Sequence, residues 1–170
     1  PFISGDGRYV VYVCDATNLV AGDTTGPYHD DIYVHDRQAG VTSLASLNSF
    51  GEQANLNGSV PTVSVDGRYV VFWSQANNLV PGDLDNFFNV FVRDRVLGTT
   101  RRVDITPSGA PSNTPGLLCV ISGDGTAIAF ASQSTNLVPH SNTWTDVFLV
   151  RHVEQQPAVY CTGRTTSQGC

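Results

Sequence analysis

The side chains best suited to bind a ligand lie in a short loop that follows an Asn-Leu-Val motif. Asp83, Asp85 and Asn89 place three oxygen-bearing side chains at close spacing in this loop. Ca²⁺ takes about six to eight oxygen ligands from such side chains, from backbone carbonyls and from water. The loop therefore predicts a calcium site, although it lacks the glycine and the glutamate of a complete EF-hand.

Two related loops occur elsewhere in the chain. The first offers Asp23, Asp30 and Asp31 and is longer, whereas the third is shorter and has Ser141 in place of the first aspartate. A metal site tolerates such changes in loop length poorly. An alternative interpretation is that Asp23 and Asp83 support turns by accepting hydrogen bonds from nearby backbone N–H groups.

The same loops carry aromatic side chains: Tyr28, Phe87, Phe88 and Trp144. Aromatic rings in neighbouring loops can form a platform for a sugar or a peptide, because they offer apolar area next to polar groups. The alternative is that the rings pack against adjacent segments and anchor their loops.

Arrangements typical of catalysis are missing from the sequence. The four histidines have no His-Glu-x-x-His spacing, and no Gly-x-Ser-x-Gly elbow occurs. His29 with Asp30 and Asp31 could form a metal or acid–base cluster, but a long polar loop accounts for the same residues. We therefore expect a protein without catalytic residues.

The four cysteines differ in their expected roles. Cys161 and Cys170 stand close enough to close a small loop by a disulfide, which points to an oxidising compartment. Cys14 and Cys119 lie in apolar segments and are expected to be buried free thiols.

Charge and hydropathy exclude two classes of partner. The chain of 170 residues has a formal net charge of −6, so it offers no basic surface for nucleic acid. Its densest basic spot, Arg101-Arg102, is expected to be solvated at a strand edge. No apolar run approaches the roughly 20 residues that span a bilayer.

The loops belong to a unit that occurs three times. Each copy contains Ser-x-Asp-Gly, an apolar run, Asn-Leu-Val, and a second apolar run that starts at Asp or Asn. Asp6, Asp66 and Asp124 mark the copies, at intervals of 60 and 58 residues. Asp-Gly between apolar runs predicts a tight hairpin, and a period of this length suits a four-stranded propeller blade.

Four strands are expected in each copy, and in the second they span residues 60–63, 69–73, 89–95 and 99–105. The second strand is apolar on both faces and must therefore be covered on both faces, as in blades stacked face to face. The repeated Asp36-Arg37 and Asp94-Arg95 are expected to form an ion pair or to support a turn.

The second copy carries Ser-x-Asp-Gly-Arg-Tyr-Val-Val, Asn-Asn-Leu-Val-Pro-Gly-Asp and Asn-Val-Phe-Val-Arg-Asp-Arg. This combination resembles the TolB-like β-propeller repeats of bacterial periplasmic and secreted proteins. The resemblance implies an all-β fold of three four-stranded antiparallel blades. It also implies a role in protein or carbohydrate recognition, or as a scaffold beside a fused domain.

We expect an N-terminally truncated blade at residues 1–48, a second blade at 49–106, a third at 107–160, and the start of a cysteine-bearing segment at 161–170. Propellers close with about four to eight blades, so three leave the ring incomplete. We favour a fragment of a six- to eight-bladed propeller; the alternative is a homodimer formed through the open blade faces.

The sequence thus predicts a non-enzymatic binding or scaffold module of an exported bacterial protein, in the periplasm or outside the cell. Its partner would be a protein, a peptide or a glycan. The alternatives are a propeller that accompanies a fused hydrolase or peptidase, and a calcium-stabilised structural repeat array.

Overall fold

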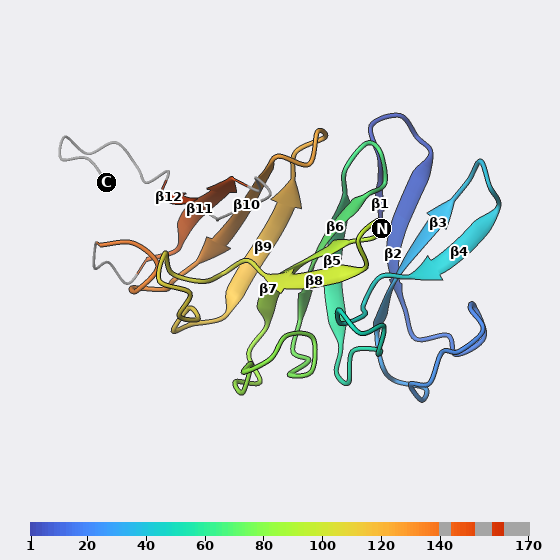
Figure 1. Ribbon diagram of the computed structural model, residues 1–170, viewed down its shortest axis with the longest axis horizontal. Helices are drawn as coiled ribbons and strands as arrows, with labels where there is room; N and C mark the ends of the chain where they lie inside the picture. The colour runs from blue at the N-terminus through green and yellow to red at the C-terminus, as the bar shows by residue number, and fades with distance from the viewer. Residues whose placement is uncertain (140–143, 152–157, 162–170) are drawn as a thin grey trace.

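The computed structural model describes residues 1–139, 144–151 and 158–161. In these residues twelve strands form three four-stranded antiparallel sheets, and no helix occurs (Figure 1). The prediction of an all-β chain with three four-stranded blades is confirmed. The described sheets do not close into a ring, and the predicted residue limits of the blades stay predictions.

The three sheets, which we call blades 1, 2 and 3, lie side by side in chain order (Figure 1). Blade 1 contains β1 (Phe2–Ile3), β2 (Tyr9–Cys14), β3 (Asp31–Asp36) and β4 (Val41–Leu44). Blade 2 contains β5 (Gly58–Val63), β6 (Tyr69–Ser74), β7 (Asn89–Asp94) and β8 (Thr99–Arg102). Blade 3 contains β9 (Gly116–Ile121), β10 (Ala127–Ser132), β11 (Asp146–Arg151) and β12 (Ala158–Cys161).

Each first hairpin turn is held by its Ser-x-Asp-Gly motif. In blade 2 the Ser64 hydroxyl donates to Asp66 Oδ1 over 2.5 Å and accepts the Tyr69 N–H over 3.0 Å. Gly67 has a φ of 69°, in the left-handed region that glycine enters without strain. The serine–aspartate bond recurs in blade 1 (2.6 Å) and in blade 3 (2.5 Å).

A second repeated pair ties this turn to the third strand. The Arg68 guanidinium binds the Asp94 carboxylate with both Nε and Nη2, and the Asp94 carboxylate also accepts the backbone N–H groups of Val96 and Leu97. The repeated aspartate therefore supports a turn, as predicted. Its ion-pair partner comes from the Ser-x-Asp-Gly turn, not from the adjacent arginine, and Arg8 with Asp36 repeats the arrangement.

The outer strand of blade 2 ends at Arg102, earlier than predicted, and the outer strand of blade 1 ends at the equivalent residue, Leu44. Beyond this point a side-chain oxygen, and not a backbone carbonyl, accepts the N–H group of the neighbouring strand. The Ser46 hydroxyl accepts the Ile32 N–H, and Asp104 Oδ1 accepts the Val90 N–H. Because these N–H groups already have an acceptor, the backbone ladder stops and the chain turns toward the next blade.

Blade 2 is covered on both faces by its neighbours. All six residues of β7 are buried, whereas β2 and β10 are buried mainly at alternate positions. The buried side chains are Tyr9 and Val11 in β2, but Ile128 and Phe130 in β10. Tyr9 corresponds to Ala127 in the repeat, so the buried positions of β10 are one residue out of step with those of β2. Blades 1 and 3 therefore bury opposite faces against blade 2.

Two apolar clusters fill the spaces between the blades. The first joins Val11, Ile32 and Val34 of blade 1 to Val70 and Phe72 of blade 2. The second is the equivalent contact of blade 2 with blade 3 and contains Val71, Val90, Val92, Ile128, Phe130 and Phe148. Blade-to-blade packing is therefore the core of the molecule. The described residues include no helix long and apolar enough to cross a membrane.

Candidate functional site

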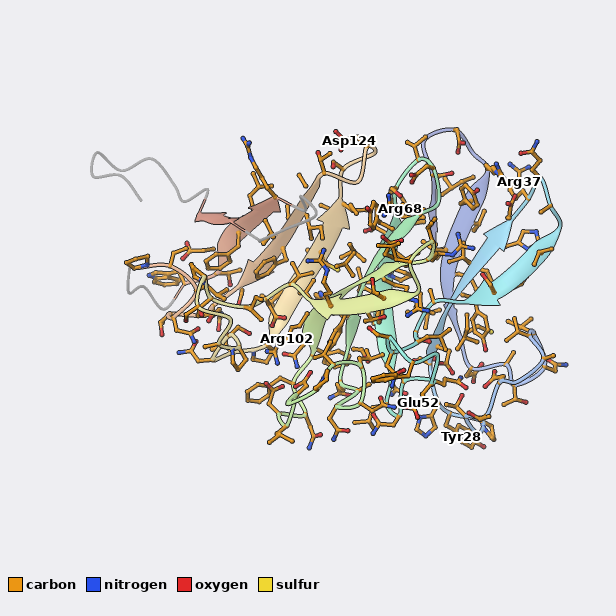
Figure 2. The ribbon with its side chains drawn as sticks, viewed as in Figure 1. Tyr28, Arg37, Glu52, Arg68, Arg102 and Asp124 are labelled. Atoms are coloured by element: carbon orange, nitrogen blue, oxygen red, sulfur yellow. The ribbon has the colours of Figure 1, made fainter. Side chains whose placement is uncertain are left out.

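The loops that carry the predicted site residues leave the same end of each sheet. The antiparallel strand order sends the β2–β3, β6–β7 and β10–β11 loops to the end where the connectors between blades begin. We call this end, formed by residues 15–30, 45–57, 75–88, 103–115, 133–139 and 144–145, the loop rim. Tyr28 and Glu52 lie at the loop rim, whereas Arg37, Arg68 and Asp124 lie toward the opposite end (Figure 2).

The structure brings together the three predicted calcium ligands of blade 2. Asn89 Nδ2 donates to Asp85 Oδ1 over 2.8 Å and to Asp83 Oδ2 over 3.2 Å. The Arg102 guanidinium bridges these acids, with Nη1 3.2 Å from Asp83 Oδ1 and 3.1 Å from Asp85 Oδ2. Arg102 Nε also contacts Asp104 Oδ1 at 3.0 Å. An internal cation thus holds this loop to β8.

The prediction that Arg101 and Arg102 are both solvated is wrong for Arg102. Its side chain is only 7% exposed, while Arg101 on the other side of the strand is exposed. Alternate residues of a strand point to opposite faces, so Arg102 is directed to the side of Asp104. The spacing Arg102-x-Asp104, together with the loop acids, is the sequence signal that could have identified this ion-pair cluster.

Three carboxylates share one guanidinium in this cluster, so negative charge is in excess. Burial raises the pKa of Asp83 and of Asp104 above the ordinary value, even though Arg102 acts in the opposite direction. Asp85 is affected differently: burial raises its pKa, but hydrogen bonds from Asn89 and Arg102 outweigh burial and lower it. The cluster therefore depends on Arg102 for its charge balance.

Calcium binding by Asp83, Asp85 and Asn89 stays a prediction. In this arrangement a calcium ion would have to displace the Arg102 guanidinium, which already supplies positive charge to both aspartates. Nowhere in the described chain are three His, Cys, Asp or Glu side chains grouped to hold a metal. A rise in the melting temperature when millimolar Ca²⁺ replaces a chelator would support the prediction.

The equivalent loop of blade 1 uses a neutral donor in place of an arginine. Leu44 stands where blade 2 has Arg102, and Gln53 Nε2 bridges Asp23 Oδ1 (2.9 Å) and Asp31 Oδ2 (2.8 Å). Asp23 Oδ1 also accepts the Thr25 N–H over 3.1 Å, the turn-supporting role given above as the alternative to calcium. The predicted ligands Asp23 and Asp31 are thus brought together by hydrogen bonds.

Other predicted residues have simpler outcomes. His29 Nδ1 is buried without a hydrogen-bond partner, and His35 Nδ1 contacts the Thr42 hydroxyl at 3.0 Å. Cys119 is a buried free thiol whose pKa is raised by burial, and Cys14 is a half-buried free thiol. The predicted Cys161–Cys170 disulfide and Ser141 in the third loop fall outside the described side chains.

The predicted aromatic platform divides into exposed rings and an anchor. Tyr28, Phe87 and Trp144 are exposed. Phe88 instead packs against Trp73, with ring centroids 6.1 Å apart, so it anchors the β6–β7 loop. Two exposed apolar side chains of the loop rim, Phe50 and Leu84, were missed from the sequence. A large apolar residue inside a polar loop or connector was the signal that could have found them.

Two grooves lie at equivalent places beside the outer strands of blades 1 and 2. The first has a volume of about 940 Å³ and lies between β4, the β2–β3 loop and the following connector. The second, about 360 Å³, lies between β8, the β6–β7 loop and its connector, and includes Arg101 and Arg102 in its lining. The larger groove is within the size range of ligand sites and opens near the loop rim.

Comparison with known proteins gives matches at the level of structure only. No family model matches the chain, and no curated protein matches it. TolB from Acinetobacter baumannii matches with a TM-score of 0.56 and 15% identity, over 98% of this chain and 32% of that one. The β-propeller domain of the Trilobed protease from Pyrococcus furiosus matches with a TM-score of 0.59 and 14% identity, over 96% of this chain and 42% of that one.

These similarities show the fold alone, and the fold is that of a TolB-like β-propeller. The chain spans less than half the length of either of these two solved structures. The cluster of loop acids, the exposed rings of the loop rim and the grooves are described from this chain's own residues.

Proposed function

We propose that this part of a TolB-like β-propeller is a non-enzymatic binding module that holds a partner protein at its loop rim. One observation carries the proposal: successive blades expose large apolar side chains at equivalent places. Tyr28, Phe87 and Trp144 occupy the same loop of blades 1, 2 and 3, and Leu84 and Phe50 lie in adjoining segments.

Exposed apolar residues that occur singly need no explanation, but a set gathered on one side of a molecule is typical of interaction sites. Tyrosine, tryptophan and phenylalanine are enriched in the buried centres of protein interfaces. Leu84 and Phe50 favour a protein partner over a glycan, because a sugar platform needs polar groups beside its rings. Peptides are the minimal form of such a partner.

The polar groups of the site support a structural role over a catalytic one. The Asp83, Asp85 and Asp104 carboxylates are bound by Arg102, and Asp23 and Asp31 by Gln53. Side chains that satisfy one another in this way fix the loops that present the aromatic rings. The resemblance to TolB-like repeats supports a location outside the cytoplasm, in the periplasm or beyond.

A second candidate function follows from one of the structural matches. The Trilobed protease has a β-propeller domain, so this chain could accompany a fused peptidase. A coding sequence that continues into a catalytic domain would favour this function. A full coding sequence without a catalytic domain would favour the binding module.

A peptide display library and a glycan array, probed with the purified chain, test the proposal. We expect peptide binders whose affinity falls at least tenfold in the variant Tyr28→Ser/Phe87→Ser/Trp144→Ser, because the rings supply the contact area. The control is Val96→Ser/Leu97→Ser, which removes exposed apolar side chains from the β7–β8 turn at the opposite end. Equal loss in both variants, binding to glycans alone, or no binder would contradict the proposal.

A further inference from the structure

The charges of this chain are separated between the two ends of its blades. The loop rim, whose segments all connect one strand to the next, contains no lysine and no arginine. Its acidic residues are Asp15, Asp23, Asp30, Glu52, Asp83, Asp85 and Asp104. At the opposite end arginines accompany the aspartates, and there Arg8 binds Asp36 and Arg68 binds Asp94 (Figure 2). The excess of negative charge therefore belongs to the loop rim.

Blades 1 and 2 differ in how the acids of this rim are balanced. In blade 2 the Arg102 guanidinium lies 3.2 Å from Asp83 Oδ1. Blade 1 has Leu44 at the place of Arg102, and the donor to Asp23 is Gln53, which is neutral. Burial raises the pKa of Asp23, but hydrogen bonds, that from Gln53 foremost, outweigh burial and lower it, so the carboxylate is ionised at neutral pH. Blade 1 thus holds negative charge without a cation of its own.

Three further acids at the loop rim of blade 1 and its connector face solvent. Asp15, Asp30 and Glu52 are all exposed. Within the described residues none of the three forms an ion pair. Glu52 Oε2 accepts an N–H from Asn48, a neutral side chain, over 2.7 Å. These carboxylates are therefore available to pair with the cations of a partner.

The exposed ring of Tyr28 belongs to the same loop as two of these acids. Its side chain is 87% exposed, and it precedes Asp30 by two residues. The Asp30 N–H donates to Asn57 Oδ1 over 3.1 Å, which ties this loop to the connector that carries Glu52. The face of an aromatic ring attracts arginine and lysine, and neighbouring carboxylates attract the same cations. An exposed ring with unpaired acids around it thus has the chemistry of a cation-binding surface.

We propose that the partner held at the loop rim is a basic segment, in which arginine or lysine adjoins large apolar side chains. This inference rests on the proposed function and specifies its partner. The cations would contact Tyr28 and the exposed acids of blade 1. Arginine suits this place best, because its planar guanidinium stacks on rings and binds carboxylates through two N–H groups. The apolar side chains would contact Leu84, Phe87 and Trp144, which are exposed in blades 2 and 3.

Sequencing of the peptides that the purified chain selects from a random display library tests this inference. We expect arginine and lysine to be more frequent in the selected peptides than in the unselected library. A synthetic copy of the best binder with every arginine and lysine replaced by glutamine should bind about tenfold more weakly. Affinity of the unchanged peptide should fall between about 20 mM and about 200 mM NaCl, because salt screens exposed charges.

The variant Asp15→Asn/Asp30→Asn/Glu52→Gln tests whether the exposed acids of blade 1 cause this preference. The substitutions remove charge and nearly preserve side-chain size. We expect the variant to bind the basic peptide and its glutamine copy with similar affinity, because only the contacts of the apolar side chains remain. Circular dichroism of the variant shows whether it remains folded.

The control is Asp6→Asn/Asp66→Asn/Asp124→Asn, which removes the same amount of charge from exposed positions at the opposite end. It should keep the preference for the basic peptide. Equal loss in both variants would overturn the inference, because the attraction would then come from the net charge of the whole molecule. A glutamine copy that binds the wild-type chain as tightly as the basic peptide would overturn it as well.

Selection of peptides that are apolar but neutral or acidic would overturn this inference alone and leave the proposed function in place. A library that yields no binder would contradict both. If basic peptides bind Tyr28→Ser/Phe87→Ser/Trp144→Ser as tightly as they bind the wild-type chain, the rings are not the contact area, and both proposals are wrong.

Discussion

At the scale of single residues, Arg102 is the side chain whose role depends most on its neighbours. Its guanidinium contacts Asp83 and Asp85 of the β6–β7 loop and Asp104 of the connector that follows β8. Breaking a buried ion pair by removing one partner typically costs about 3–5 kcal/mol, because the other charge is left uncompensated. The loop that presents Leu84 and Phe87 is therefore fixed largely by one cation.

Arg102→Met tests this role. We expect the free energy of unfolding to fall by about 3–5 kcal/mol at pH 7, measured by urea denaturation. A carboxyl group whose pKa is raised by folding, as for Asp83 and Asp104, stabilises the fold at low pH and loses that contribution as pH rises. The variant should therefore recover part of its deficit at pH 5.

The neighbouring substitution Arg101→Met is the matched control. Arg101 is exposed, and exposed ion pairs contribute roughly 0–1 kcal/mol. Similar destabilisation by both substitutions, or a deficit of Arg102→Met that does not change with pH, would show that the three carboxylates do not depend on Arg102.

The pKa of Asp124, in the Ser-x-Asp-Gly turn of blade 3, gives a second prediction. Hydrogen bonds from the Ser122 hydroxyl and from Thr126 lower the pKa of Asp124 to about 2. Ser122→Ala should raise that pKa toward its ordinary value, as measured by NMR titration of the carboxyl carbon. Thr126→Ala, which keeps the serine bond, should raise it less.

A depressed carboxyl pKa stabilises the fold above the unfolded pKa, and this contribution is lost as pH falls toward the folded value. The contribution of Asp124 should therefore disappear between about pH 4 and pH 2. An unchanged Asp124 pKa in Ser122→Ala would show that the Ser122 hydroxyl does not lower the pKa of this carboxyl group.

At the scale of elements, the sequence predicted the strands and hairpin turns well and the ends of the outer strands poorly. Apolar runs and Asp-Gly turns are local signals, and they located β6 and β7 to within one residue at either end. The outer strands ended early because Ser46 and Asp104 bind backbone N–H groups of the third strands. Such contacts join residues 14 apart in sequence, and composition does not reveal them.

The difference between local sequence signals and contacts made only in the folded chain also explains the outcomes for the aromatic residues. Phe87 and Phe88 are adjacent and chemically identical, yet Phe88 packs against Trp73 and Phe87 is exposed. The sequence placed both in the correct loop. Which ring is the anchor depends on the approach of β6, and that is a property of the folded blade.

Gly116→Ala tests how closely neighbouring blades pack. A Cβ at Gly116 of β9 would lie 2.7 Å from Val90 Cγ2 of β7, and Val90 is buried between blades. Overpacking of this kind typically costs about 1–3 kcal/mol. We expect a corresponding fall in the free energy of unfolding, measured by urea denaturation.

Gly26→Ala is the control for this substitution. Gly26 lies in the β2–β3 loop, and a Cβ there would meet no atom within 4 Å. Its effect should be small. If Gly116→Ala is as harmless as the control, the second and third blades do not pack as tightly as described.

At the scale of the whole molecule, the sequence predicted the stacking of blades because the repeated second strand is apolar on both faces. β2, β6 and β10 carry similar patterns, yet within the described residues only β6 lies in a blade with neighbours on both sides. The order of the blades could be predicted from the repeat. The opposite exposure of β2 and β10 could not be predicted, because it depends on which face of each blade packs against blade 2.

Hydrogen exchange followed by mass spectrometry most directly tests the central claim, that three equivalent blades stabilise one another by face-to-face packing. β6 and β7, covered on both sides within one chain, should exchange most slowly. Gly116→Ala should accelerate exchange in β7 and β9 while β2 and β3 keep their protection. Equal protection of all three sheets, or acceleration spread evenly over the chain, would contradict the claim.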